Sequence, residues 1–195
     1  MSVLQHLKKE MRLKMAETLK NVENIGEQSE NVGKIVMESE WFRNSRRMSV
    51  YVSTKGEIQT DQIIRFALQQ GKQVFIPMFT KGNRKMEMVE VPSQQDFNKL
   101  PITLWGIRQP DPTWNWQKYE ETGPLDIVLI PGVAFTKDLK RLGHGMGYYD
   151  RWLSLHLEKF DKMPRRVGLA LRQQIVEHVP TGETDVDLEE IVVDH

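Results

Sequence analysis

The chain has 195 residues, in which 27 lysines and arginines balance 27 aspartates and glutamates, and it contains no cysteine. This length suits one domain or a tightly fused pair of lobes. Without cysteine, disulfides, cysteine-ligated zinc, iron–sulfur clusters and thiol catalysis are excluded. A net charge of zero gives no global field that would attract nucleic acid or a membrane surface, so neither is expected as a partner.

No apolar run approaches the roughly 20 residues that a membrane-spanning helix needs. The first ten residues also lack the apolar block and the small-residue cleavage site of a secretory signal. We therefore expect a soluble protein that works in the cytoplasm.

Two helices are predicted at the start of the chain. Ser2 and Gln5 fit a capping box, and apolar residues at helical spacing continue the first helix to about Asn24. A second apolar stripe predicts a helix from Glu27 to about Phe42.

The next segment has the pattern of a βαβ unit. Residues 48–52 predict a strand, Thr60 is expected to cap a helix that Gly71 ends, and residues 73–77 predict a second strand. Such a crossover is right-handed and leaves its two strands parallel.

The remaining segments continue the alternation of strands and helices. Residues 86–91 alternate like a strand, and the proline-rich residues 110–124 predict a loop or a mobile flap. Residues 126–131 are apolar on both faces, as in a central parallel strand. A helix from Gly147 to about Leu157 and a strand at 167–171 follow. This order predicts an α/β fold, a Rossmann-like three-layer α/β/α sandwich with a mostly parallel central sheet.

Glycines alternate with other residues after the predicted central strand. A loop at 132–142 leads to Gly143, Gly145 and Gly147, and a helix begins there. Alternating glycines let backbone N–H groups approach an anion, and the helix start adds a favourable dipole. Ligands of open α/β sheets bind where the strands deliver their carboxyl ends.

Charged residues flank these glycines. Lys140 and Arg141 precede them and would neutralise a polyphosphate, whereas Asp150 in the first helical turn would hold Mg²⁺. Neither the Rossmann nor the Walker glycine pattern is met. The spacing alone also fits a tight strand-to-helix turn with one aromatic side chain packed inward.

A family resemblance rests on this segment. Residues 131–135 followed by 141–151 resemble the signature of the 5-formyltetrahydrofolate cyclo-ligase family, also called 5,10-methenyltetrahydrofolate synthetase. Other matching segments keep the family's order along the chain: residues 8–12, 52 with 56–60, 105–107 with 109–110, and 179–185. The resemblance implies one domain over residues 1–195, in which helices 2–42 pack on an α/β core of residues 47–195.

The resemblance also implies a reaction. In it, 5-formyltetrahydrofolate is converted to 5,10-methenyltetrahydrofolate at the expense of ATP, with Mg²⁺ as the cofactor and a monomer or weak dimer as the active form. Such chemistry needs positioning, charge neutralisation and exclusion of water more than a protein nucleophile.

The family motifs assign roles to residues of this sequence. The implied ATP contacts are Lys8, Lys9, Arg12, Arg141, Gly143, His144, Gly145, Met146, Gly147, Tyr148 and Tyr149. The implied folate contacts are Val52, Glu57, Trp105, His144, Gly145, Met146, Gly147 and Tyr148. The implied Mg²⁺ ligands are Asp150 and Asp185, and the implied catalytic residues are Arg141, Tyr148 and Asp150. His144 and Met146 depart from the family pattern, because many relatives have a basic residue or glycine there.

Each of these assignments has a simpler alternative. The cations of residues 8–12 also fit a solvated helix face. Glu57 also fits a surface residue, and the acidic run 183–190 also fits a solvated tail. Trp114 and Trp116 fit ordinary packing as well as a ligand platform.

Two other functions occur in proteins of similar α/β build or nucleotide-binding character. A sugar-phosphate isomerase or CoA transferase of similar build needs a catalytic carboxylate in its own signature, and none stands at a convincing position. A non-catalytic nucleotide- or RNA-binding relative would carry an RNA-binding module or an eroded glycine loop, and the sequence has neither.

Overall fold

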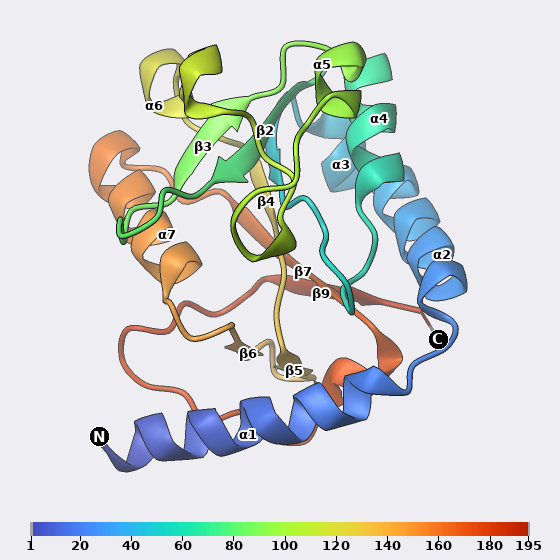
Figure 1. Ribbon diagram of the computed structural model, residues 1–195, viewed down its shortest axis with the longest axis vertical. Coiled ribbons are helices and arrows are strands. Elements are labelled where there is room, and N and C mark those ends of the chain that lie inside the picture. Colours follow the sequence, from blue (N-terminus) through green and yellow to red (C-terminus); the bar gives the residue numbers. More distant parts are fainter. Residues whose placement is uncertain (1, 195) are drawn as a thin grey trace.

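A six-stranded sheet in the order β3-β2-β1-β4-β7-β9 runs through the computed structural model, which describes residues 2–194 (Figure 1). Its strands are β1 (Arg47–Val50), β2 (Gln73–Met78), β3 (Glu87–Glu90), β4 (Ile127–Ile130), β7 (Arg165–Ala170) and β9 (Glu190–Val193). Neighbouring strands are parallel except for the antiparallel pair β2 and β3. The predicted α/β class with a mostly parallel sheet is confirmed.

Helices cover both faces of this sheet and make three layers. One face carries α2 (Ile25–Glu38), α3 (Glu40–Asn44), α4 (Asp61–Gln69) and α5 (Gln94–Asn98), and the other carries α6 (Tyr119–Thr122) and α7 (Tyr148–Phe160). All four side chains of β4 are buried. Ile127 and Leu129 pack toward α2 and α4, whereas Val128 and Ile130 pack toward α7. A strand that is covered on both faces has a continuous apolar sequence, which is the pattern that predicted a central strand at residues 126–131.

A second sheet of three short strands lies at one end of the molecule, in the order β6-β5-β8. Its strands are β5 (Ala134–Thr136), β6 (Arg141–Leu142) and β8 (Ile175–Val176). The prediction of a loop at 132–142 is therefore wrong. These strands of two or three residues show no periodicity, and β8, which pairs with β5, lies far along the chain.

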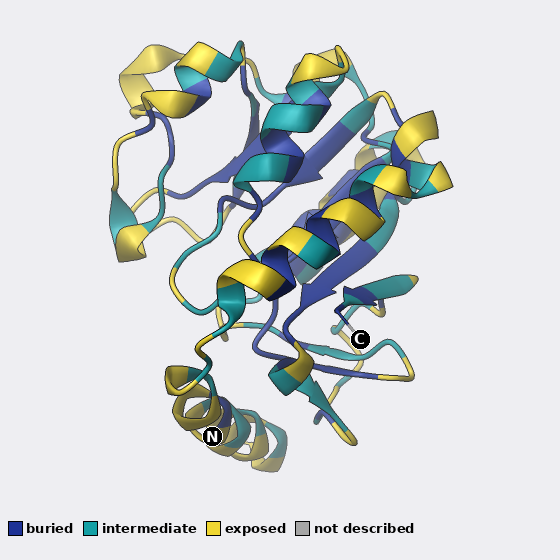
Figure 2. Ribbon diagram, turned by 90° about the vertical axis from the view of Figure 1, so that its right-hand side faces the viewer, coloured by how far each residue is buried: buried dark blue, intermediate teal, exposed yellow. Residues whose placement is uncertain are grey.

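The first helix, α1 (Val3–Lys20), packs on this small sheet rather than on the large one (Figures 1 and 2). Met15 is 2% exposed and packs with Val133 and Leu142. The predicted capping box is present, because Ser2 Oγ accepts from Gln5 N and Ser2 N donates to Gln5 Oε1. Consequently α1 lies close to the glycine segment, which follows β6.

Three predicted elements differ from the structure. The helix expected to reach Phe42 breaks at Ser39, because the Ser39 hydroxyl accepts from Phe42 N at 3.2 Å and caps α3. The hydroxyl of Thr60 does not cap α4 but donates to Tyr51 O at 2.6 Å. The loop predicted at 110–124 contains the short helix η2 (Pro112–Trp114) and α6.

The acidic run 183–190 is not a solvated tail. Leu188 is 4% exposed, and its N–H donates to Leu139 O at 3.0 Å. Glu190 begins β9, which pairs with β7. Two further short helices are η1 (Leu104–Gly106) and η3 (Arg172–Gln174). Among residues 2–194, no helix is long and apolar enough to cross a membrane.

His156 is fully buried in α7 and is held as the neutral imidazole. Its Nε2 accepts from Leu125 N at 3.0 Å, and its Nδ1 lies 2.8 Å from Lys162 O, to which it donates. The ring stacks on Tyr119 with the centroids 5.5 Å apart. Burial, the largest cause, lowers the pKa of His156. The hydrogen bond to Lys162 O opposes this shift, and the Lys162 charge reinforces it.

This burial makes the stability depend on pH. An unfolded chain binds a proton at His156 near pH 6.5, whereas the folded chain does so only at lower pH. The contribution of neutral His156 to the free energy of unfolding is therefore complete above about pH 6.5. It is lost as the pH falls from there toward the pKa of His156 in the folded protein, by at most about 1.4 kcal/mol per pH unit. Urea unfolding at several pH values should show a smaller slope for His156→Gln than for the wild type. Equal slopes would contradict the assignment.

Candidate active site

A cavity of about 390 Å³ opens at the carboxyl ends of the central strands. This volume lies within the ~300–1,000 Å³ of typical small-molecule sites. Its lining residues are Tyr51, Val52, Thr54, Glu57, Pro77, Phe79, Trp105, Ile107, Pro131, Arg141, Gly143, His144, Met146, Gly147, Tyr148, Tyr149 and Asp150. Strands β1, β2 and β4 lead directly into several of these residues, as expected for an open α/β sheet.

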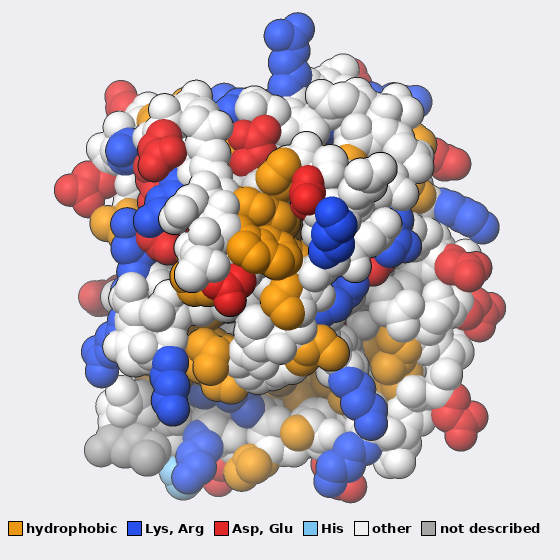
Figure 3. Space-filling view, turned by 45° about the horizontal axis from the view of Figure 1, so that its top comes forward, with side chains coloured by type: hydrophobic (Ala, Val, Ile, Leu, Met, Phe, Trp, Pro, Cys, Tyr) orange, Lys and Arg blue, Asp and Glu red, His pale blue; other side chains and the backbone are white. Residues whose placement is uncertain are grey.

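Hydrophobic side chains gather on the face of the molecule shown in Figure 3, bordered by lysines, arginines and carboxylates. At the cavity itself, Trp105 is 60% exposed and Met146 is 50% exposed. Apolar groups this exposed lose contact with water when a ligand with a flat ring covers them, so they favour binding of such a ligand.

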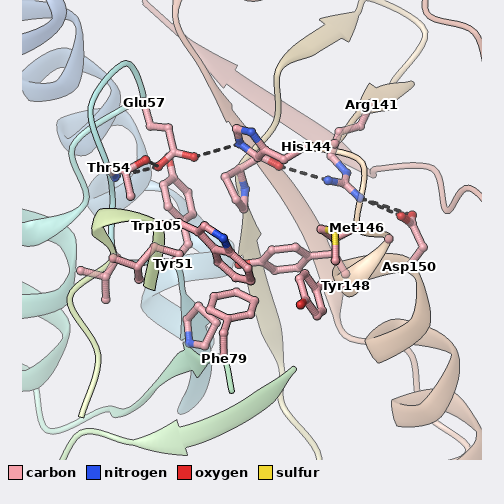
Figure 4. Close-up of a pocket in the computed structure, with 17 residues that line it drawn as sticks. Tyr51, Thr54, Glu57, Phe79, Trp105, Arg141, His144, Met146, Tyr148 and Asp150 are labelled. Carbon is pink, nitrogen blue, oxygen red and sulfur yellow. Dashed lines mark hydrogen bonds and ion pairs between the residues drawn. The ribbon is translucent and has the colours of Figure 1, made fainter. Parts of the chain in front are cut away.

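Three aromatic rings form one wall of the cavity (Figure 4). The Phe79 centroid lies 5.7 Å from Trp105 and 4.9 Å from Tyr148, both in edge-to-face geometry. Trp105 has a φ of 58°, which a tryptophan rarely adopts. Backbone strain of this kind persists where the surroundings fix it, and it is common at binding sites.

Gln109 holds this wall from behind. It is 3% exposed, its Oε1 accepts from Phe79 N at 2.9 Å, and its Nε2 donates to Phe79 O at 2.8 Å. The side chain thus satisfies both backbone groups of Phe79, as a neighbouring strand would. It also ties the segment that carries Trp105 to the end of β2.

Gln109→Leu should both destabilise the protein and loosen the aromatic wall of the cavity. The substitution leaves two buried backbone groups of Phe79 unpaired, at about 2–5 kcal/mol in total. We expect the KM for the ring-bearing substrate to rise about tenfold and kcat to change less, because a misplaced wall weakens binding. Gln109→Glu keeps an acceptor for Phe79 N but sets a buried carboxylate oxygen against Phe79 O, so it should destabilise the protein at least as much. A wild-type melting temperature for Gln109→Leu would contradict this role.

Glu57 faces the cavity opposite the glycine segment (Figure 4). Its Oε2 accepts from Thr54 N at 2.8 Å and from Thr54 Oγ1 at 3.0 Å. Its Oε1 lies 3.2 Å from His144 Nε2. The Glu57 side chain is 12% exposed whereas that of His144 is 61% exposed. A fixed carboxylate therefore meets a histidine that solvent surrounds.

Arg141 and Asp150 form the charged centre of the other side (Figure 4). Arg141 Nη2 donates to both carboxylate oxygens of Asp150, at 3.2 and 3.3 Å, and Nη1 donates to Pro131 O at 3.2 Å. The Arg141 side chain is only 6% exposed. Asp150 Oδ1 also accepts from Val186 N at 3.1 Å. These bonds from both terminal nitrogens fix the guanidinium, so Arg141 and its counter-ion Asp150 form an ordered ion pair at the cavity wall.

The glycine segment has the conformation that its residues allow. Gly145 and Gly147 have φ values of 107° and 63°, where side chains are strained. A Cβ atom at Gly143 would lie 2.9 Å from Arg141 Nη1. Gly147 occupies the N-cap position of α7, so the N-terminal dipole of that helix points toward the cavity rim.

Helix α1 reaches this segment from below. Arg12 Nε donates to Gly143 O at 2.8 Å, and Lys8 Nζ pairs with the carboxylate of Asp185. Lys8 and Arg12 are therefore not a solvated face, whereas Lys9 is exposed. Burial lowers the pKa of Arg12, and Asp185 opposes that shift.

Most of the residues given a binding or catalytic role in the sequence line the cavity, and six do not: Lys8, Lys9, Arg12, Lys140, Gly145 and Asp185. Lys140 pairs instead with Asp187. Arg12 still contacts Gly143, which lines the cavity, whereas Lys8 contacts Asp185, which does not. The roles of all these residues in binding or catalysis stay predictions.

Sequence reasoning missed several lining residues: Tyr51, Thr54, Pro77, Phe79 and Ile107. Tyr51 and Pro77 stand at the ends of predicted parallel strands, which is a signal that could have found them. Phe79 carries no such signal, because Gln109 positions it from a distant segment.

The model of the 5-formyltetrahydrofolate cyclo-ligase family matches residues 4–194 of this chain. A probable 5-formyltetrahydrofolate cyclo-ligase of Caenorhabditis elegans is 53% identical over 195 residues, which cover 98% of this chain and 95% of that protein. The 5-formyltetrahydrofolate cyclo-ligase of Mus musculus is 35% identical over 151 residues, with coverage of 77% and 74%.

Two solved structures share the fold. The 5,10-methenyltetrahydrofolate synthetase of Aquifex aeolicus matches with a TM-score of 0.74 at 26% identity, covering 95% of this chain and 89% of that one. The Mycoplasma pneumoniae synthetase matches with a TM-score of 0.71 at 19% identity, covering 96% and 99%. The family match, the sequence identity and the shared fold agree: the chain belongs to the 5-formyltetrahydrofolate cyclo-ligase family and is a cyclo-ligase enzyme.

Proposed function

We propose that this enzyme uses Mg²⁺ and ATP to phosphorylate the formyl oxygen of 5-formyltetrahydrofolate and then closes the ring through N10. The observation that carries the proposal is that one cavity joins an aromatic wall and a fixed carboxylate to a buried arginine and a glycine loop. A flat heterocycle and a polyphosphate fit the two ends. One chain supplies every residue invoked, so we propose that residues 1–195 act as one domain and as a monomer.

ATP is proposed to bind with its phosphates at the glycine loop. Arg141 neutralises their charge, and backbone N–H groups from Gly143 to Tyr149 approach them without side chains in the way. Lys8 and Arg12 lie just below this loop on α1. Lys9 is exposed, which favours Lys8 as the lysine that contacts ATP.

The folate ring system is proposed to lie against Phe79, Trp105 and Tyr148. Glu57 then accepts from the N–H edge of the pterin, after His144 has moved off its Oε1. Val52 lines the same cavity. This arrangement places the formyl group between Glu57 and Arg141, where a γ-phosphate and a formyl oxygen can meet.

The carboxylates near the loop suit a magnesium ion that arrives with ATP. Mg²⁺ in such sites takes one or two carboxylates and completes its shell with phosphate oxygens and water. Asp150 lines the cavity, and the N–H of Val186, the neighbour of Asp185, bonds to it. Asp185 is itself bonded to Lys8 and to Gly182 N. Asp150 and Asp185 would hold the ion, which supplies charge neutralisation of the phosphates.

The proposed reaction has two steps. In the first, the formyl oxygen attacks the γ-phosphorus, the bond to the bridging oxygen breaks, and ADP leaves with that electron pair. In the second, N10 attacks the formyl carbon, loses its proton, and the phosphate group leaves with the former formyl oxygen. Arg141 stabilises the charge that moves between the phosphates, and the aromatic wall excludes water.

The direct test is spectroscopic. Purified protein is mixed with 5-formyltetrahydrofolate and Mg-ATP, and the near-ultraviolet absorbance of the methenyl product is followed together with ADP release. We expect one ADP for each product molecule. ATP hydrolysis without product, or ATP binding without either, would overturn the proposal.

A further inference from the structure

One polar group in the cavity wall has no partner. Tyr149 is 7% exposed, and its hydroxyl is shielded from water and meets no hydrogen-bonding group within residues 2–194. The neighbouring phenol of Tyr51 is 3% exposed, but its hydroxyl donates to Ile58 O at 3.1 Å. Buried hydroxyls are seldom left unsatisfied, because they have given up their hydrogen bonds to water. Tyr149 lines the cavity, so a ligand there can supply the missing acceptor once a shift of the side chains that shield the hydroxyl brings the two groups together.

The Tyr149 hydroxyl is available as a hydrogen-bond donor. The guanidinium carbon of Arg141 lies 5.7 Å from the centre of the ring, on the side of the proposed phosphates. A phenol carries its proton at neutral pH. The group can therefore donate a hydrogen bond at neutral pH.

Glu57, which lines the same cavity, offers the opposite chemistry. Its Oε2 is held by Thr54, and its Oε1 contacts only the exposed ring of His144 among the described residues. Once His144 turns into water, Glu57 offers an acceptor close to a neutral donor. A ligand that matches both groups has hydrogen-bond donors for Glu57 along one edge, followed by an acceptor for Tyr149.

The edge of a 4-oxo pteridine has this order, with the 2-amino group and N3–H as donors and O4 as the acceptor. We propose that the Tyr149 hydroxyl donates to O4 of the bound folate and thereby selects 4-oxo over 4-amino folates. This inference rests on the proposed function. It gives Tyr149, assigned to ATP from the motif, a role in recognising the folate.

The test compares Tyr149→Phe with the wild type on two substrates, 5-formyltetrahydrofolate and its 4-amino counterpart. We expect the KM for the 4-oxo substrate to rise about tenfold and kcat to change less than threefold. The KM for the 4-amino substrate should stay within twofold. Any change that the 4-amino group causes at Glu57 is the same in both enzymes, so the ratio of the two KM values isolates Tyr149.

Two further measurements separate this role from a structural one. Because its hydroxyl is unpaired in the free protein, Tyr149→Phe should not lower the melting temperature, whereas Tyr51→Phe should. Calorimetric binding of both folates without ATP repeats the comparison in the absence of turnover. Discrimination in binding with no product formed would overturn the proposed function and support the hydrogen bond. Equal KM increases for both substrates, or no increase for the 4-oxo substrate, would overturn the inference.

Discussion

Asp150→Asn is expected to lower kcat by about 10²–10³-fold, the range found when one preorganised electrostatic group is removed from an active site. The substitution keeps the shape of the side chain and its acceptor for Val186 N, but it removes the charge that pairs with Arg141. It also removes a proposed ligand of Mg²⁺, so the magnesium concentration needed for half-maximal rate should rise. Initial rates measured across a magnesium titration give both quantities.

Asparagine is a better probe here than alanine. Arg141 is 6% exposed, and an alanine at position 150 would leave that buried cation without its counter-ion and Val186 N without its acceptor, although Arg141 would keep its bond to Pro131 O. Such a change destabilises the protein by several kcal/mol and confounds the activity measurement. Asparagine should cost about 1–3 kcal/mol, which a protein with ~5–15 kcal/mol of stability tolerates at 25 °C.

Asp194→Asn is the matched control. Asp194 is 6% exposed and pairs with Arg172, but it does not line the cavity. We expect a similar loss of stability with kcat changed less than threefold. A wild-type kcat and magnesium dependence in Asp150→Asn would show that this carboxylate serves Arg141 alone.

The layers of the fold could be predicted from the sequence because each has a strong periodic signal. The four buried residues of β4 formed the most strand-like run, and the alternation of strands and helices gave the parallel sheet. Elements that depend on distant partners could not be predicted. Strand β9 follows an acidic run and exists because β7 offers it a parallel edge, and β6 spans two residues.

The candidate site likewise has a part that could be predicted from local sequence and a part that could not. Its glycine loop is local, so Gly143, Gly145 and Gly147 could be located from their spacing and from the helix that follows. The aromatic wall is not local, because Gln109 fixes Phe79 across about 30 residues of chain. Nor does spacing reveal that Tyr149 would be buried without a hydrogen-bonding partner, which depends on everything that surrounds it.

The conformation of the glycine loop leads to the second large effect. Gly145 has a φ of 107°, and a Cβ atom there would also lie 3.3 Å from the guanidinium carbon of Arg12. Arg12 is a flexible side chain and can shift, but the backbone strain in Gly145→Ala remains, at about 1–3 kcal/mol. The loop can relieve this strain by moving its N–H groups away from the phosphates. We expect the binding constant for ATP to fall roughly 10–100-fold, which is the factor that corresponds to a strain energy of this size.

Calorimetric titration with ATP and the KM for ATP check this result. Because the loop lies at the surface, its rearrangement should lower the free energy of unfolding by less than the strain itself. Gly26→Ala is the matched control, since Gly26 lies in α2 with an ordinary φ and no atom within 4 Å of an added Cβ. It should raise stability by about 0.5–1 kcal/mol and leave ATP binding unchanged. If Gly145→Ala binds ATP as tightly as the wild type, the phosphates do not rest on this loop, and the cations of α1 must carry the nucleotide instead.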